Sequence, residues 1–127
     1  MEGNRRIQRV EKELRDLISS YMVIQLGGEI EGIATITRVM VSKDLRSARV
    51  LVYNQGGETV AKQNVEVLQN KAHQINQYIN SQVRMKYLPK MKFFVDTKFE
   101  DAMKVQHELR KLELEREERE SQDSDDE

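Results

Sequence analysis

The sequence predicts an α+β sandwich in which helices pack on one face of a three-stranded sheet. Three observations lead to this prediction: the succession of helical and extended patterns along the chain, its length and its apolar content. The length of 127 residues leaves room for one domain of ordinary size and not for two. Apolar residues make up 38% of the chain, which is enough for a core without disulfide bonds or metal ions. The predicted order of elements is α-β-β-α-α-β-α.

The first predicted element is an amphipathic helix from Asn4 to about Met22. Its apolar residues recur at steps of three and four residues, which places them on one face of a helix. Three glycines between positions 27 and 32 indicate that a loop follows. The other faces of the helix carry cations, namely Arg5, Arg6, Arg9, Lys12 and Arg15.

Two strands are predicted next, at Ala34–Val41 and Ala48–Tyr53. The first is rich in Thr, Ile and Val and contains no residue that breaks a strand. Because only a few residues around Asp44 separate the two strands, we expect an antiparallel hairpin. Asp44 can turn the chain by hydrogen bonding to its own backbone two residues on. Leu45 and Ala48 are expected to pack into the core at this corner.

A long helical segment begins after Gly57 and runs to Val83. It is long for a single globular helix, so a break is predicted within Lys71–Asn76, where most residues are polar. Pro89, the only proline, ends the segment and favours extended geometry at the preceding residue. The third strand is predicted at Met91–Asp96.

The last predicted helix begins at Thr97–Glu100, which has the Ser/Thr-x-x-Glu form of a capping box. From Leu112 to the end there are nine acids and two arginines, a charge of −7, which leaves 19 basic and 13 acidic side chains, or +6, on residues 1–111. We therefore divide the chain into a folded domain, residues 1–111, and an acidic helix end and disordered tail, residues 112–127. The tail is either a solvated appendage or a polyanion that folds over the basic domain and competes with nucleic acid.

The composition excludes several kinds of functional site. There is no cysteine, and hence no disulfide framework, thiolate zinc site or cysteine nucleophile. His73 and His107 have no partner at metal-ligand spacing, and no glycine-rich phosphate-binding motif is present. We expect no catalytic residue, metal ion or cofactor. No apolar run approaches the ~20 residues that cross a bilayer, so a soluble, cytoplasmic protein without a membrane partner is predicted.

Basic residues are arranged in two clusters. The first lies in the opening helix, and the second surrounds the proline, with Tyr87 and Phe93 interleaved. Such cations neutralise phosphates and release counterions, so that affinity falls with salt. An ordinary solvated surface is the alternative explanation for either cluster. The clusters are Arg5, Arg6 and Arg9, and Arg84, Lys86, Lys90 and Lys92.

Three blocks of sequence carry a resemblance to a known family. The first block, Arg6–Val10, lies in the opening helix; the second, Ile36–Val50, contains a Val-x-x-Ser-x-Asp-Leu-x-x-Ala-x-Val pattern that forms two strands and their turn. The third, Val83–Phe93, places a basic pair ahead of the proline and an apolar strand. In these blocks the chain resembles ribosome-binding factor A, a K-homology-type family that acts in maturation of the bacterial small ribosomal subunit.

The resemblance implies a type II K-homology-like α-β-β-α-α-β sandwich with an extra C-terminal helix. It also implies binding to the small (30S) ribosomal subunit and its precursor 16S rRNA, with assistance to late folding and end processing of that RNA. The implied partners are the subunit, its rRNA and a GTPase that could aid release, and the chain is expected to be a monomer. An alternative from another class is a protein-interaction module that docks through its sheet edge or C-terminal helix without RNA.

The sequence departs from this family at one point. The family carries an Ala-x-Gly kink between two helices, and that kink falls here on Lys71-Ala72-His73, so the glycine is missing. Histidine visits positive φ more often than most residues, and His73 could therefore hold the kink; alternatively, the two helices merge. Asn76 stands where many relatives have arginine, and Lys71 could restore a positive charge.

The predicted RNA-binding residues combine the two clusters with the kink positions. The prediction depends on one geometric condition, that the opening helix and the segment around the proline face the same side of the domain. The residues are Arg5, Arg6, Arg9, Lys71, His73, Asn76, Arg84, Lys86, Lys90 and Lys92.

Overall fold

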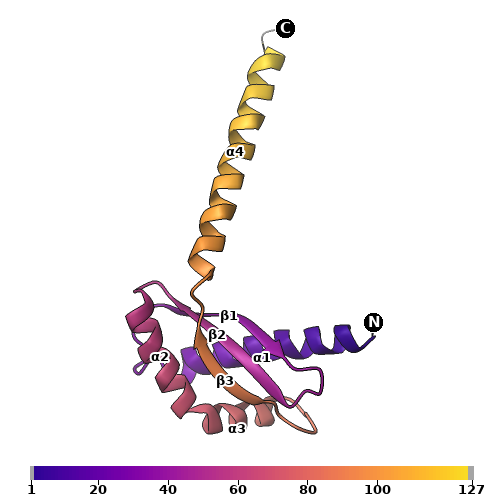
Figure 1. Ribbon diagram of the computed structural model, residues 1–127, viewed down its shortest axis with the longest axis vertical. Helices are drawn as coiled ribbons and strands as arrows, with labels where there is room; N and C mark the ends of the chain where they lie inside the picture. Colours follow the sequence, from indigo (N-terminus) through magenta and orange to yellow (C-terminus); the bar gives the residue numbers. More distant parts are fainter. Residues whose placement is uncertain (1, 126–127) are drawn as a thin grey trace. The chain divides into compact units, whose positions relative to one another are not determined.

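The computed structural model describes residues 2–125 of the chain and the side chains of residues 5–121. These residues form helices and strands in the predicted order (Figure 1). The elements are α1 (Glu2–Gln25), β1 (Ala34–Val41), β2 (Ser47–Asn54), α2 (Glu58–Asn70), α3 (Ala72–Gln82), β3 (Lys90–Val95) and α4 (Phe99–Asp125). The chain divides into two compact units, Met1–Asp96 and Thr97–Glu127.

The three strands form one mixed sheet in the order β1-β2-β3. β1 and β2 are antiparallel, with Val41 opposite Ala48, which confirms the predicted hairpin. β2 and β3 are parallel, with Ser47 beside Lys90. Parallel neighbours need a long crossover connection, and α2 and α3 supply it.

The core lies between one face of the sheet and helices α1, α2 and α3. Every second residue of β2 is buried, from Ala48 to Asn54, because successive side chains of a strand point to opposite faces. The predicted sandwich with helices on one face is therefore confirmed. The helices contribute almost completely buried side chains to this core: Leu14, Ile18, Leu68, Ile75 and Ile79.

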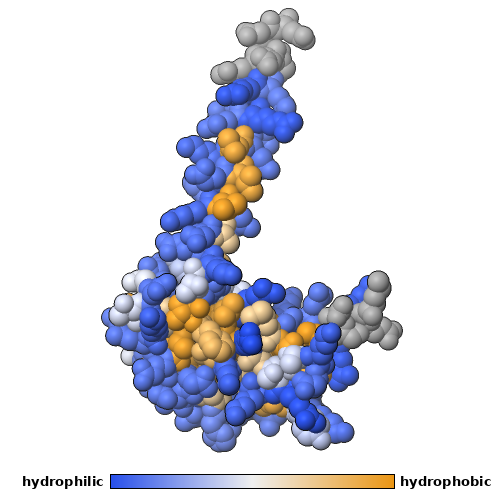
Figure 2. Space-filling model, in the orientation of Figure 1, coloured by the Kyte–Doolittle hydropathy of each residue, from blue (hydrophilic) through white to orange (hydrophobic). Residues whose placement is uncertain are grey.

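The opposite face of the sheet is partly exposed. Phe94 on β3 is 43% exposed, and the strand register places it in one row with Leu51 and Arg38. Arg49 and Lys92 share the next row. Figure 2 shows hydrophobic side chains gathered over the strands on this face. This face therefore combines apolar and cationic side chains.

The break between α2 and α3 falls on Lys71, inside the predicted interval. Its φ of −96° and ψ of 8° belong to the bridge region, which non-glycine residues can adopt. His73 lies within α3, and Leu45 is the only non-glycine residue with positive φ in the described part of the chain. Both expectations for the missing glycine are wrong, since His73 does not hold the kink and the helices do not merge. The chain turns at negative φ, so no glycine is needed.

Asn64 on α2 forms hydrogen bonds that connect the loop between α1 and β1 to the rest of the unit. Its Nδ2 donates hydrogen bonds to the Glu31 carbonyl at 2.8 Å and to Asn54 Oδ1 at 2.6 Å, and its Oδ1 accepts one from the Glu31 backbone N–H at 3.0 Å. The residue is 1% exposed. Gly32 adopts a φ of +67°, and a Cβ there would lie 3.1 Å from Asn54 Nδ2. This close approach at positive φ explains the glycine.

The second unit consists of the helix α4. The helix continues to Asp125, and residues 126 and 127 lie outside the described residues. The division at Lys111, into a folded domain and an acidic helix end with a disordered tail, stays a prediction. Opposite charges four residues apart support helices, as in the pair formed by Arg116 Nε and Glu120 Oε1 at 3.7 Å.

Candidate nucleic-acid interface

An open groove of about 870 Å³ lies at the end of the first unit where β2 and β3 begin. Three segments line it: the first turns of α1, the turn between β1 and β2, and the segment between α3 and β3. The lining residues are Arg6, Arg9, Val10 and Glu13 of α1, residues 44–46 of the turn and residues 84–89 before β3.

The groove brings members of both predicted basic clusters together. Arg6 and Arg9 line it from the opening helix, and Arg84 and Lys86 line it from the segment before the proline. All four side chains are exposed. The opening helix and the proline segment thus face one surface, and cations gathered in a groove raise the local concentration of anions. Contact of these residues with RNA stays a prediction.

Cations outnumber carboxylates in the groove. Arg46 adds a fifth cation, against the carboxylates of Glu13 and Asp44. The Asp44 carboxylate is held by hydrogen bonds within the β1–β2 turn. The Ser42 hydroxyl donates to Asp44 Oδ1 at 2.6 Å, and the Arg46 backbone N–H donates to the same oxygen at 3.1 Å. The Ser42 hydroxyl, followed by the Arg46 N–H, holds the pKa of Asp44 below its ordinary value. Asp44 therefore stabilises the turn as a carboxylate, as the sequence predicts.

Substituting Ser42→Ala should raise the pKa of Asp44 toward its ordinary value, because the lost hydrogen bond is the main cause of the lowered pKa. A carboxyl that titrates lower in the folded protein adds stability above its unfolded pKa of about 3.9, and this stability is lost as the pH falls through the folded pKa. The free energy of unfolding of the variant should therefore be lower than that of the parent near neutral pH and equal to it in strong acid. NMR titration of the Asp44 carboxyl measures the shift.

The matched control is Ser47→Ala, which removes a hydroxyl from the same hairpin. Ser47 contacts the turn through its backbone N–H, which donates to Ser42 Oγ at 3.1 Å. This bond survives the substitution, so the titration of Asp44 should not change. An Asp44 pKa that is the same in the Ser42→Ala variant and the parent would contradict the assigned cause.

Leu45 occupies a left-handed conformation, with φ 61°. This conformation costs an L-residue about 1–2 kcal/mol. Its half-buried side chain lines the groove beside Val10 and Met85 and does not join the core cluster, so the prediction that Leu45 packs into the core is wrong. The same prediction is confirmed for Ala48, which is 2% exposed.

Tyr87 is the aromatic side chain of the groove. It is 75% exposed, and Lys86 Nζ lies 5.9 Å from the centre of its ring. An exposed ring beside cations offers a stacking surface for an unpaired base. Phe93, the other aromatic residue interleaved with the second basic cluster, is 5% exposed and belongs to the core. Alternation with cations in the sequence did not distinguish these two roles.

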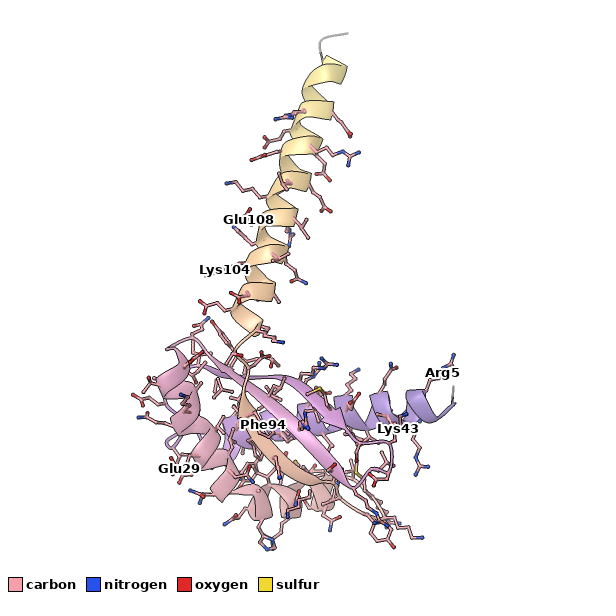
Figure 3. The ribbon with its side chains drawn as sticks, in the orientation of Figure 1. Arg5, Glu29, Lys43, Phe94, Lys104 and Glu108 are labelled. Atoms are coloured by element: carbon pink, nitrogen blue, oxygen red, sulfur yellow. The ribbon has the colours of Figure 1, made fainter. Side chains whose placement is uncertain are left out.

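Three residues of the predicted clusters lie outside the groove lining. Arg5 is exposed near the first turn of α1, and Figure 3 shows it at the same end of the unit as Lys43 of the β1–β2 turn. Lys90 and Lys92 are exposed and alternate with buried residues of β3, so they point to the open face of the sheet. Lys90 and Lys92 therefore belong to a second cationic surface, on the open face of the sheet. It adjoins the groove at the end of the sheet where β2 and β3 begin.

Lys71 and His73 lie at the end of α3 away from the groove, and Asn76 lies near the middle of that helix. The 11 residues of α3 span about 16 Å. Lys71 Nζ lies 3.9 Å from Glu29 Oε1, and this ion pair reduces the charge that Lys71 offers to a ligand. His73 is exposed, and Asn76 is half-buried, with its Oδ1 buried and without a hydrogen-bond partner among the described residues. The structure does not bring Lys71, His73 and Asn76 to the groove.

Arg46 is the groove cation that the sequence analysis missed. It precedes β2 directly, and its carbonyl accepts a hydrogen bond from the Lys90 N–H at 2.8 Å. This contact exists because β2 and β3 are parallel and begin at the same end of the sheet. The two helices predicted between the second and third strands are the kind of crossover that parallel strands need, and this signal could have placed Arg46 beside the start of β3.

Among the side chains that the structure describes, those of residues 5–121, no group of three His, Asp or Glu could hold a metal ion. No helix within residues 2–125 has the length and apolar character needed to cross a membrane.

Comparisons with known proteins agree on one family. The family model described as ribosome-binding factor A matches residues 6–109. The chain is 35% identical over 116 residues to a ribosome-binding factor A of Bdellovibrio bacteriovorus, covering 91% of this chain and 87% of the relative. It is 30% identical over 121 residues to that of Protochlamydia amoebophila, covering 94% and 92%.

The fold agrees with a solved structure as well. The crystal structure of ribosome-binding factor A from Thermus thermophilus superimposes with a TM-score of 0.62 at 19% identity, covering 70% of this chain and 93% of that one. This similarity confirms the predicted K-homology-like fold. The matched family consists of binding factors rather than enzymes. By its sequence and its fold, the chain belongs to the ribosome-binding factor A family.

Proposed function

We propose that this chain binds the small (30S) ribosomal subunit through precursor 16S rRNA and assists late folding and end processing of that RNA. One observation carries the proposal: five cations from three separate segments meet in one open groove. The name shared by the relatives, ribosome-binding factor A, supports the ribosome as the partner. No bond is made or broken by the chain itself.

The chemistry of the groove fits the backbone of folded RNA. RNA duplexes are recognised mainly through shape and through phosphate and 2′-hydroxyl contacts. Four of the five cations are arginines, whose planar guanidinium groups donate two parallel hydrogen bonds to a phosphate. Tyr87 adds one stacking surface at the same place. The groove therefore favours a phosphate backbone that runs past an unpaired base.

The remaining predicted residues are proposed as outer contacts. Lys90 and Lys92 lie on β3 outside the groove, on the open face of the sheet. Arg5 lies in α1, one residue before the groove residue Arg6. Lys71, His73 and Asn76 are proposed as a separate, weaker contact, because α3 separates them from the groove and Lys71 already has an acidic partner.

Such a factor acts by differential binding. A protein that binds one conformation of an RNA more tightly than the others shifts the population toward that conformation. We further propose that the chain does this as a cytoplasmic monomer, and that a GTPase aids its release.

Sedimentation with ribosomal particles tests the proposed function. We expect the full chain to co-migrate with free small subunits at low salt and to be lost from them as the salt concentration rises, because the free energy gained by releasing counterions becomes smaller at higher salt. Recovery of the chain only in the unbound fraction at low salt would contradict the proposal. Retention of its partners after nuclease treatment would favour the protein-interaction alternative.

A further inference from the structure

Helix α4 carries an apolar seam, which we define as Ala102, Val105, Leu109 and Leu112. Val105, Leu109 and Leu112 are 58%, 56% and 60% exposed, and Ala102 is exposed as well. Steps of three, four and three residues place the four side chains on one side of a helix, as at the a and d positions of a coiled coil. Figure 2 shows a hydrophobic stripe along α4. We propose that this seam docks a basic amphipathic helix of a partner protein.

Acidic side chains flank the seam. On one flank Asp101, Glu108 and Glu115 occupy the g positions, each directly before an a position, and on the other flank Glu113 occupies an e position. These residues are exposed, and Figure 3 shows Glu108 projecting from the side of the helix. In a coiled coil, the e and g residues set the choice of partner through charge.

The cations of this part of α4 lie outside the e and g positions. At 100° per residue, Lys104 and Lys111 fall at c positions and Arg110 at a b position, where Lys104 and Lys111 are neighbours of Glu108 and Glu115. The seam ends at Leu112, because the next a position is Arg116. Between Asp101 and Glu115 a partner helix on the seam would therefore meet acids and no cation at the positions that choose the partner.

A second copy of the chain does not fit the seam. In a parallel pair of α4 helices, Glu108 of one copy would face Glu113 of the other, and in an antiparallel pair Glu108 would face Glu108. Like charges at these positions disfavour pairing. An RNA ligand is disfavoured for the same reason, because phosphates would meet the acidic flanks. A helix with lysine or arginine beside its own apolar stripe fits both the seam and its flanks.

This inference goes beyond the proposed RNA binding and does not depend on it. The groove is a cationic surface for RNA, and the seam is an apolar and acidic surface for a basic protein segment. A particle that contains both ligands would be bound at two places, and two linked contacts bind more tightly than either alone.

A binding experiment with two synthetic peptides tests the inference. The probe is a helical peptide of about three heptads with leucine at a and d and lysine at e and g; its control carries glutamate at e and g. Fluorescence anisotropy with the full chain should show binding of the lysine peptide at least about tenfold tighter than that of the glutamate peptide. Equal binding of both peptides, or binding of neither, would overturn the proposal.

Matched variants locate the contact. Leu109→Gln with Leu112→Gln should weaken binding of the lysine peptide about tenfold or more, since buried apolar anchors carry most of the energy of such interfaces. The control, Met103→Gln with Leu114→Gln, changes side chains of similar exposure, 49% and 54%, that lie off the seam, and should bind within about twofold of the parent. Because all four side chains are exposed, circular dichroism should show the same helix content in both variants.

The remaining outcomes separate this inference from the proposed function. RNA binding by the Leu109→Gln, Leu112→Gln variant should equal that of the parent, so that a failure of peptide binding says nothing against the groove. Equal peptide binding by the seam and control variants would overturn the inference. Self-association that the seam substitutions abolish would also overturn it, because a second copy would then occupy the seam.

Discussion

Replacing Arg84 and Lys86 together by alanine should weaken binding of small-subunit precursor RNA on the order of tenfold at moderate salt. Both side chains line the groove, and each is proposed to neutralise one phosphate. Removal of two such contacts should reduce the slope of log K against log salt by about 1.4–1.8, at 0.7–0.9 per phosphate. The melting temperature should hardly change, because both side chains are exposed. RNA titrations over a series of salt concentrations measure both effects.

A variant with the same loss of charge controls for net charge. Lys62 on α2 and Lys104 on α4 are exposed and do not line the groove. Their joint replacement by alanine should leave the salt slope close to that of the parent. Unaltered RNA binding by the Arg84→Ala, Lys86→Ala variant would remove these two residues from the site. An equal loss in both variants would show that overall charge, and not the groove, attracts the RNA.

Substituting Asn64→Asp should destabilise the first unit by about 3–5 kcal/mol at neutral pH, in the range for an uncompensated buried charge. The Asn64 amide donates to the Glu31 carbonyl and to Asn54 Oδ1. A carboxylate would face these two acceptors without a proton, in a position that is 1% exposed. The melting temperature should fall by more than about 10 °C on the scale for a domain of this size. Thermal and urea unfolding measure the loss.

The pH dependence of the stability of the Asn64→Asp variant shows whether the buried charge causes the destabilisation. Burial and facing acceptors raise the pKa of the new carboxyl in the folded state above its unfolded value. The penalty is therefore absent below about pH 4, the unfolded pKa, and grows as the pH rises toward the folded pKa. Gln63→Glu makes the same amide-to-acid change at the neighbouring exposed position and should alter stability by less than about 0.5 kcal/mol. A loss in the Asn64→Asp variant that is equal at pH 4 and pH 7 would contradict the charge argument.

Local signals were sufficient for the elements. The helical spacing of apolar residues in α1, the β-branched run in β1 and the polar stretch at Lys71 each depend on neighbouring residues, and all three predictions are confirmed. The short connection around Asp44 likewise fixed the antiparallel hairpin. These features follow from local backbone preference and side-chain alternation.

Predictions that depended on contacts between residues distant in sequence were less accurate than the predictions of the elements. Leu45 is predicted in the core, whereas it lines the groove from a turn in which its φ is 61°, a conformation that no local pattern indicates for a leucine. For the missing kink glycine the sequence predicts either His73 at the kink or two merged helices, whereas Lys71 makes the turn at negative φ. The hydrogen bonds of Asn64 to a loop 33 residues away in sequence left no trace in any local pattern.

The sequence by itself determined the order of the elements, the family and the presence of two basic clusters, because each of these follows from short stretches of residues. Only the tertiary structure decided which cations share a surface. Arg6, Arg46 and Arg84 meet because β2 and β3 pair in parallel and begin at one end of the sheet, while α3 holds Lys71 at a distance. The pairing of β2 with β3, which are distant in sequence, depends on burial of the whole core rather than on any one segment, and so the groove appears only when the chain is folded.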